Sequence, residues 1–136
     1  MRITAFVCGL SAAMLTTVST LALADAPNKP VQVMQAEVNG MPTDAVQEIK
    51  VMAATMQPGE KSVRHTHNFP VTLYIIEGEL TLDIAGQKPI TAKAGEAMIE
   101  QANLDTTASN PSATAITKVI MFYASTPKTP FLVPLK

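Results

Sequence analysis

Short apolar or alternating segments, separated by turn-forming residues, run along most of the chain. β-branched residues are frequent in these segments, and residues 79–84 alternate so that Leu80, Leu82 and Ile84 share one face of a strand. The expected strands are 31–38, 46–56, 71–76, 79–84, 89–93, 96–101, 105–109 and 115–124. With short extra pieces between them, this pattern predicts about nine or ten strands.

Glycine and proline mark the breaks between these segments. Pro58-Gly59 ends the second segment, and Ala85-Gly86-Gln87 is expected at the tip of a hairpin. No segment after residue 25 has a helical period with start and stop signals. The sequence therefore predicts an all-β sandwich or barrel. The proline-rich stretch 127–134 cannot be a central strand, so its apolar residues should pack across the barrel or against another subunit.

The N-terminal 24 residues differ in character from the rest. Arg2 is followed by an uncharged stretch, rich in Ala, Leu, Val and Thr, which closes on Ala22-Leu23-Ala24. This pattern is typical of a cleaved secretory signal peptide, and a retained membrane anchor is the alternative. Cleavage would release residues 25–136 into the periplasm or the medium, with no further membrane association.

Composition excludes several kinds of chemistry. The only cysteine, Cys8, would leave with the signal peptide, so the exported protein could have no disulfide, thiolate metal site or cysteine nucleophile. The net charge is −1, no basic run is present, and the chain has no Trp. These features argue against nucleic acid as a partner, because binding its backbone requires clustered cations.

The only two histidines, His65 and His67, are the strongest candidates for a chemical role. They are two positions apart, so on a strand both imidazoles point the same way and can converge on one metal ion. No obvious third metal ligand lies near this pair in the sequence.

Three motifs in order resemble the small single-domain members of the cupin superfamily. They are Gly59-x5-His65-x-His67, then Tyr74-Ile-Ile-Glu-Gly78, then Lys93-Ala-Gly95-Glu-Ala. The resemblance implies a jelly-roll β-barrel with an internal pocket for a small molecule, often with Mn, Fe, Ni, Zn or Cu, and often a homodimer. The expected division is an N-terminal strand and connection at 25–45, a barrel core at 46–124 and a tail at 125–136.

The resemblance also predicts an incomplete set of metal ligands. The glutamate that many cupins place after the second histidine falls on Val71 or Thr72, and the third histidine falls on Thr106. Two carboxylates are candidates to complete the site. Asp105 would give a two-histidine, one-carboxylate set, although strand alternation points it outward unless a bulge intervenes. Glu100 is the other candidate, and its facing is not fixed by the sequence.

Two classes of function remain open from the sequence. The first is a binding module that holds a small molecule in the barrel, with a vestigial or weakly held divalent metal at His65 and His67. The second is a metal-dependent enzyme of the dioxygenase or isomerase type. The missing ligands favour the first, no catalytic residue can be assigned, and the expected pocket residues are Tyr74, Gln101 and Thr106.

Overall fold

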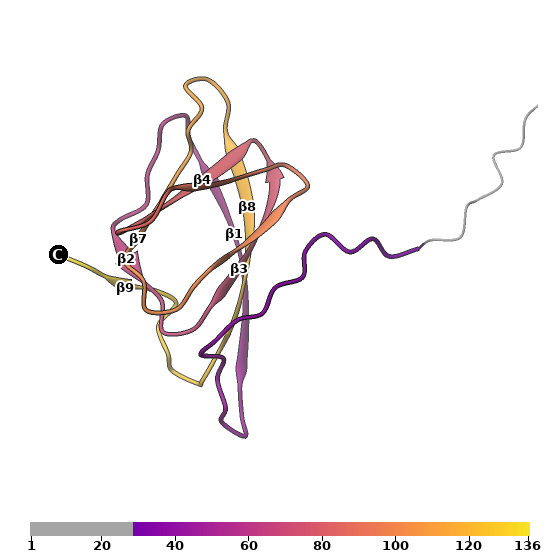
Figure 1. Ribbon diagram of the computed structural model, residues 1–136, viewed down its shortest axis with the longest axis vertical. Coiled ribbons are helices and arrows are strands. Elements are labelled where there is room, and N and C mark those ends of the chain that lie inside the picture. Colours follow the sequence, from indigo (N-terminus) through magenta and orange to yellow (C-terminus); the bar gives the residue numbers. More distant parts are fainter. Residues whose placement is uncertain (1–28) are drawn as a thin grey trace, which may run out of the picture. The chain divides into compact units, whose positions relative to one another are not determined.

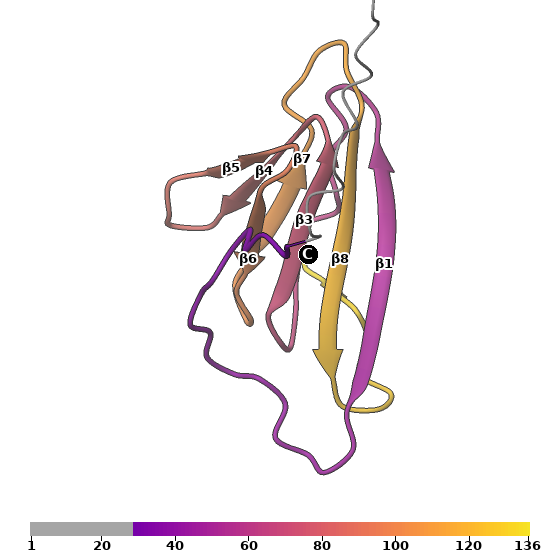
Figure 2. The same cartoon turned by 90° about the vertical axis from the view of Figure 1, so that its right-hand side faces the viewer.

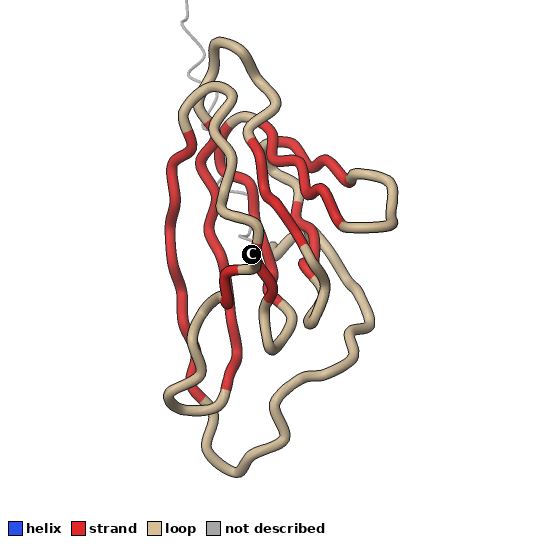
Figure 3. Tube along the Cα trace, turned by 90° about the vertical axis from the view of Figure 1, so that its left-hand side faces the viewer, coloured by secondary structure: helices blue, strands red, loops and turns tan. Residues whose placement is uncertain are grey.

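The computed structural model describes residues 29–136, of which residues 31–136 form one unit. All regular secondary structure in this range is β-strand (Figure 3). Within it, no helix has the length and apolar character needed to cross a bilayer. The predicted signal peptide, with Cys8, lies outside the described residues.

Within the described part of the chain, nine strands form two sheets (Figures 1 and 2). The strands are β1 (Glu48–Met56), β2 (His65–Thr66), β3 (Val71–Glu77), β4 (Glu79–Ile84), β5 (Ile90–Lys93), β6 (Ala97–Glu100), β7 (Thr106–Ser109), β8 (Thr117–Ser125) and β9 (Val133–Pro134). One sheet has the order β1-β8-β3-β6, and the other has the order β5-β4-β7-β2-β9. The pairs formed by these strands are antiparallel, so the all-β prediction is confirmed.

The core lies between the inner faces of the two sheets. Alternation along β4 buries Leu80, Leu82 and Ile84, as the sequence predicts. Alternation along β3 buries Val71 and Ile75 in the same way. Because side chains from both inner faces interdigitate, this apolar layer is the main source of stability in a small barrel.

The tight turn from β3 to β4 depends on Gly78. Its φ of 75° lies in the left-handed region, and a Cβ at this position would come within 2.4 Å of the Ile116 carbonyl oxygen. The turn places β3 and β4 in different sheets, so this glycine sets the path of the chain from one sheet to the other.

The strand expected at 31–38 is not formed. This segment has no pairing partner among residues 29–136, and Val31 and Val33 are exposed. Met34 and Val38 instead lie along a groove on the outer face of the β1-β8-β3-β6 sheet, with Phe122. A β-branched composition therefore did not suffice here, because strand formation depends on a neighbour that supplies hydrogen bonds.

The C-terminal tail agrees with the prediction that it is no central strand. Its two-residue strand β9 pairs only with β2, at the edge of the five-stranded sheet. Phe131 and Leu132, just before β9, turn inward and line the interior cavity. The tail thus crosses from the end of β8 in one sheet to β2 in the other (Figure 1).

Candidate metal centre

The two histidines meet inside the barrel. His65 opens β2 and His67 follows one residue after its end, and only 4% and 1% of their surfaces are exposed. Their Nε2 atoms are 3.1 Å apart, and the rings meet edge to face with centroids 4.8 Å apart. The i, i+2 spacing therefore places both imidazoles on one face, as predicted.

Backbone carbonyls fix the tautomer of both rings. Nδ1 of His65 lies 2.7 Å from the Val63 carbonyl oxygen, and Nδ1 of His67 lies 2.5 Å from that of Phe131. A carbonyl oxygen can only accept, so each Nδ1 must carry a proton and donate it. In the neutral rings Nε2 then holds a bare lone pair, which is the form of histidine that binds metals.

Glu100 brings a carboxylate to the same point. It is the last residue of β6, 3% exposed, and its Oε1 lies 3.2 Å from Nε2 of His65 and 3.4 Å from Nε2 of His67. With neutral rings none of these three atoms has a proton to share, and Glu100 Oε1 is left buried without a hydrogen-bond donor. Three lone pairs thus converge on side chains that are almost fully buried.

The spacing of the three atoms suits a transition-metal ion. An ion about 2.1 Å from each donor would set neighbouring donors about 3.0 Å apart at right angles and about 3.4 Å apart in a tetrahedron. The observed separations of 3.1, 3.2 and 3.4 Å lie across this range. His65, His67 and Glu100 could therefore hold a metal ion. The expectation of an incomplete ligand set is not confirmed, because Glu100 supplies a third donor.

A proton on one of the imidazole rings can take the place of the metal ion in this cluster. The hydrogen bond to Glu100 raises the pKa of His65, although burial acts in the opposite direction. Burial alone would raise the pKa of the Glu100 carboxyl, but hydrogen bonds and charge from the two histidines lower it to about 2. The cluster is therefore compatible with a buried imidazolium–carboxylate pair or with neutral rings around a cation.

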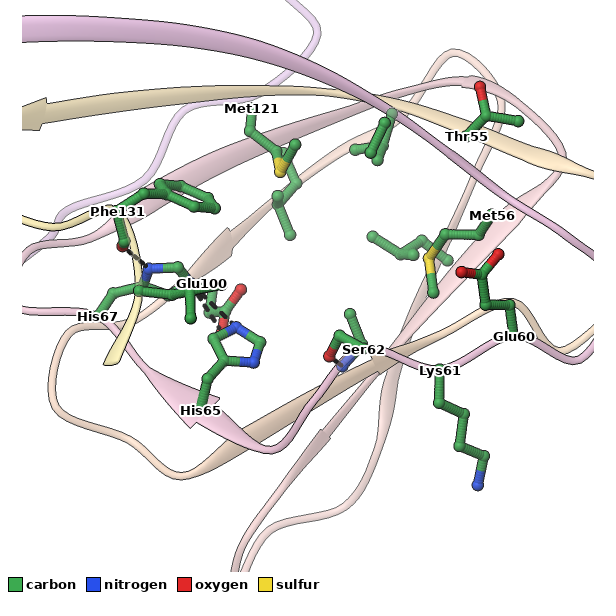
Figure 4. A pocket seen from close by; sticks show the side chains of 16 residues that line it. Thr55, Met56, Glu60, Lys61, Ser62, His65, His67, Glu100, Met121 and Phe131 are labelled. Carbon is green, nitrogen blue, oxygen red and sulfur yellow. Dashed lines mark hydrogen bonds and ion pairs between the residues drawn. The ribbon is translucent and has the colours of Figure 1, made fainter. Parts of the chain in front are cut away.

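The cluster lies at one end of an interior cavity of about 260 Å³ (Figure 4). Glu60 and Lys61 lie at the opposite end, away from the histidines. Between them the wall is mostly apolar, formed by Leu73, Leu80, Val119, Met121, Phe131 and Leu132. An ion held by the cluster would face a space suited to a small, largely apolar molecule.

The structure places Asp105 outside this cluster. Its carboxylate is bound by the guanidinium of Arg64, which holds the pKa of Asp105 below its usual range. The reason is the one that alternation gives: Asp105 precedes Thr106, which pairs with His65 and faces inward, so Asp105 faces outward. The predicted metal role of Asp105 is therefore not supported by its position.

None of the three expected pocket residues lines the cavity. Tyr74 lies between the buried Leu73 and Ile75 on β3, so its side chain is on the outer face. Gln101 follows the inward-facing Glu100 and is only half-buried. Thr106 does face inward beside His65, but it is 1% exposed and lies outside the cavity wall.

Comparison with known proteins identifies the family. Residues 52–123 match the cupin domain, which is more than half of the chain. The chain belongs to the cupin family. No curated protein matches it.

Solved structures show the same cupin fold. An RmlC-like cupin from Methanocaldococcus jannaschii, with a double-stranded β-helix fold, is 27% identical with a TM-score of 0.54, covering 70% of this chain and 95% of its own. A cupin-like protein from Thermotoga maritima is 18% identical with a TM-score of 0.55, covering 64% of each chain. The polyketide cyclase RemF from Streptomyces resistomycificus is 14% identical with a TM-score of 0.54, covering 68% of this chain and 64% of its own.

The strand register explains how this cupin obtains a carboxylate without the expected glutamate. Val71, at one of the two positions where the resemblance expected that residue, lies directly opposite Glu100 on β6. Paired residues of antiparallel strands point to the same face. The carboxylate therefore arrives at the histidines from the neighbouring strand.

Proposed function

We propose that this cupin holds a divalent transition-metal ion with His65, His67 and Glu100 and binds a small, mostly apolar organic molecule in the adjoining cavity. The observation that carries the proposal is the convergence of three donor atoms, 3.1 to 3.4 Å apart, at the end of that cavity. Three protein ligands leave coordination positions for a donor atom of the bound molecule.

The surrounding residues support this assignment. The apolar wall favours a ligand whose body carries no charge, because burying an unpaired charge there would be costly. The metal would supply a Lewis-acidic contact for one polar atom of that ligand. The protein's own contribution is to fix the two imidazoles through their Nδ1 protons and to bury the three donor side chains.

Metal content is the direct test. Purified wild-type protein should bind close to one equivalent of Zn²⁺, Mn²⁺ or Fe²⁺, whereas the His65→Ala/His67→Ala variant should bind none. Glu60→Gln is the matched control, since it removes a carboxylate at the other end of the cavity and should leave metal binding unchanged. Absence of stoichiometric metal binding in the wild type would contradict the proposal.

A metal-dependent enzyme is the second candidate, and the ligand set itself favours it. Two histidines and one carboxylate with open positions are typical of non-haem iron oxygenases. Small compounds that raise the melting temperature of metal-loaded but not metal-free protein should be incubated with the iron-loaded protein in air. A new product by mass spectrometry would support the enzyme, and unchanged compound would support the binding module.

Export is proposed on the N-terminal sequence alone. The uncharged stretch that ends at Ala22-Leu23-Ala24 supports cleavage after Ala24 and a periplasmic or secreted protein. Intact-mass analysis of the protein from cell fractions tests this. A full-length protein in the cytosolic fraction would contradict it.

A further inference from the structure

The two histidines obtain their backbone partners in different ways. His65 donates to Val63, two residues away, so the local chain fixes its tautomer. His67 donates to Phe131, 64 residues away in the C-terminal tail. Of the two Nδ1 hydrogen bonds, only that of His67 therefore depends on a distant segment.

The tail is built into the barrel around that contact. The ring of Phe131 lies 4.8 Å from that of His67 and 5.5 Å, edge to face, from that of Tyr123. At the start of the tail, Lys50 donates to the Thr129 carbonyl oxygen at 3.0 Å. These contacts hold the Phe131 carbonyl against Nδ1 of His67, and Phe131 itself lines the cavity (Figure 4).

Arg64 fastens the far end of the tail. β9 pairs with β2, and the Leu135 amide donates to the Arg64 carbonyl oxygen at 2.9 Å. The Arg64 side chain donates from Nη1 to the Lys136 carbonyl oxygen at 2.8 Å and from Nε to Asp105 at 2.7 Å. Arg64 immediately precedes His65, so the same short stretch carries one histidine and the anchor of the tail.

We propose that residues 130–136 are a positioning element of the metal centre, which fixes the tautomer and orientation of His67 through the Phe131 carbonyl and is held by Arg64 and Asp105. The inference rests on the proposed metal site and adds to it a dependence on the tail. Hydrogen-bond partners of metal-bound histidines typically affect affinity by about tenfold to a hundredfold. Asp105 then affects the metal centre indirectly, by holding the Arg64 side chain that binds the tail.

Nitrogen-15 NMR of the imidazole rings tests the proposal, because the protein has only two histidines. The pH of the metal-free protein is raised from about 8.5, where an ordinary histidine is neutral, until neither ring's shifts change further, because Glu100 raises the pKa of His65. In the wild type both rings should carry the proton on Nδ1. In a chain that ends at Pro130, His67 should become a mixture of tautomers while His65 stays unchanged. Zinc affinity should fall by about tenfold to a hundredfold.

Arg64→Ala provides a second test if the shortened chain does not fold. It removes the Lys136 and Asp105 contacts together, and Lys118→Ala is the matched control because it breaks the exposed Lys118–Glu77 pair far from the tail. Arg64→Ala should mix the His67 tautomers and weaken zinc binding several-fold, and Lys118→Ala should do neither. Equal behaviour of the two variants, or an unchanged His67 in a folded shortened chain, would overturn the proposal. The tautomer measurement needs no metal. It therefore tests the role of the tail even if the wild-type protein fails to bind metal, a result that would contradict only the proposed function.

Discussion

Two regions of the barrel interior are buried for different physical reasons. Around Leu82 and Ile75, fully buried apolar side chains stabilise the fold simply by leaving water. Around His65, His67 and Glu100, equally buried side chains bring three lone pairs together, which costs stability unless a cation or proton joins them. The apolar region therefore accounts for the fold, whereas the polar region could hold a metal ion or a proton.

Truncating a side chain in the apolar region should have the largest effect on the free energy of unfolding. Leu82→Ala removes a side chain with no exposed surface and should lower the free energy of unfolding by about 2–5 kcal/mol. Leu73→Ala, whose side chain borders the existing cavity, should fall at the lower end of that range. Denaturant titration measures both. At denaturant concentrations well below the unfolding midpoint, Leu82→Ala should keep wild-type zinc affinity. A large loss of affinity would mean that the apolar region and the histidine–glutamate cluster are coupled.

Removing the Glu100 carboxylate should weaken zinc binding without lowering the stability of the metal-free protein. Glu100→Leu should weaken zinc binding about a hundredfold or more, because two histidines alone remain as ligands. At a pH where both rings are neutral, the metal-free protein should be as stable as the wild type or more stable, since the carboxylate that is removed is buried there without a hydrogen-bond donor. Calorimetric titration and thermal unfolding give the two values. A large loss of stability without metal would show that Glu100 is needed for the fold.

Relocating the carboxylate tests the register between β3 and β6. Glu100→Val should lose zinc binding as Glu100→Leu does, and adding Val71→Glu should recover about tenfold of the affinity, because Val71 and Glu100 are directly paired. Val71→Glu combined with wild-type Glu100 is the control and should destabilise the metal-free protein by crowding two carboxylates. No recovery in the double variant would mean that the two positions do not reach the same point.

Two kinds of feature could be predicted from the sequence: the local ones that depend on neighbours along the chain, and the cupin barrel that the spaced motifs indicate. The alternation in β4 and the His65–His67 spacing were enough to place those side chains correctly. The role of Glu100 depends on its pairing with Val71, 29 positions earlier, and that register is not encoded in either segment alone. The Phe131 contact to His67 likewise needs the path of the tail. The failed strand at 31–38 has the same cause, since propensity cannot supply a partner.

Metal-loaded and metal-free protein should respond differently to pH, which gives the smallest of these effects. The hydrogen bond to Glu100 raises the pKa of His65 above 6.5, despite its burial. In the metal-free protein, this favours the folded state below the ordinary pKa and is lost as the pH rises through the raised one. Metal binding needs an unprotonated Nε2, so it strengthens over the same range. The difference in melting temperature between zinc-loaded and chelator-treated protein should therefore widen by about 2–4 °C from about pH 6 to about pH 8. A constant difference across that interval would mean that protons and metal do not compete for the same atoms.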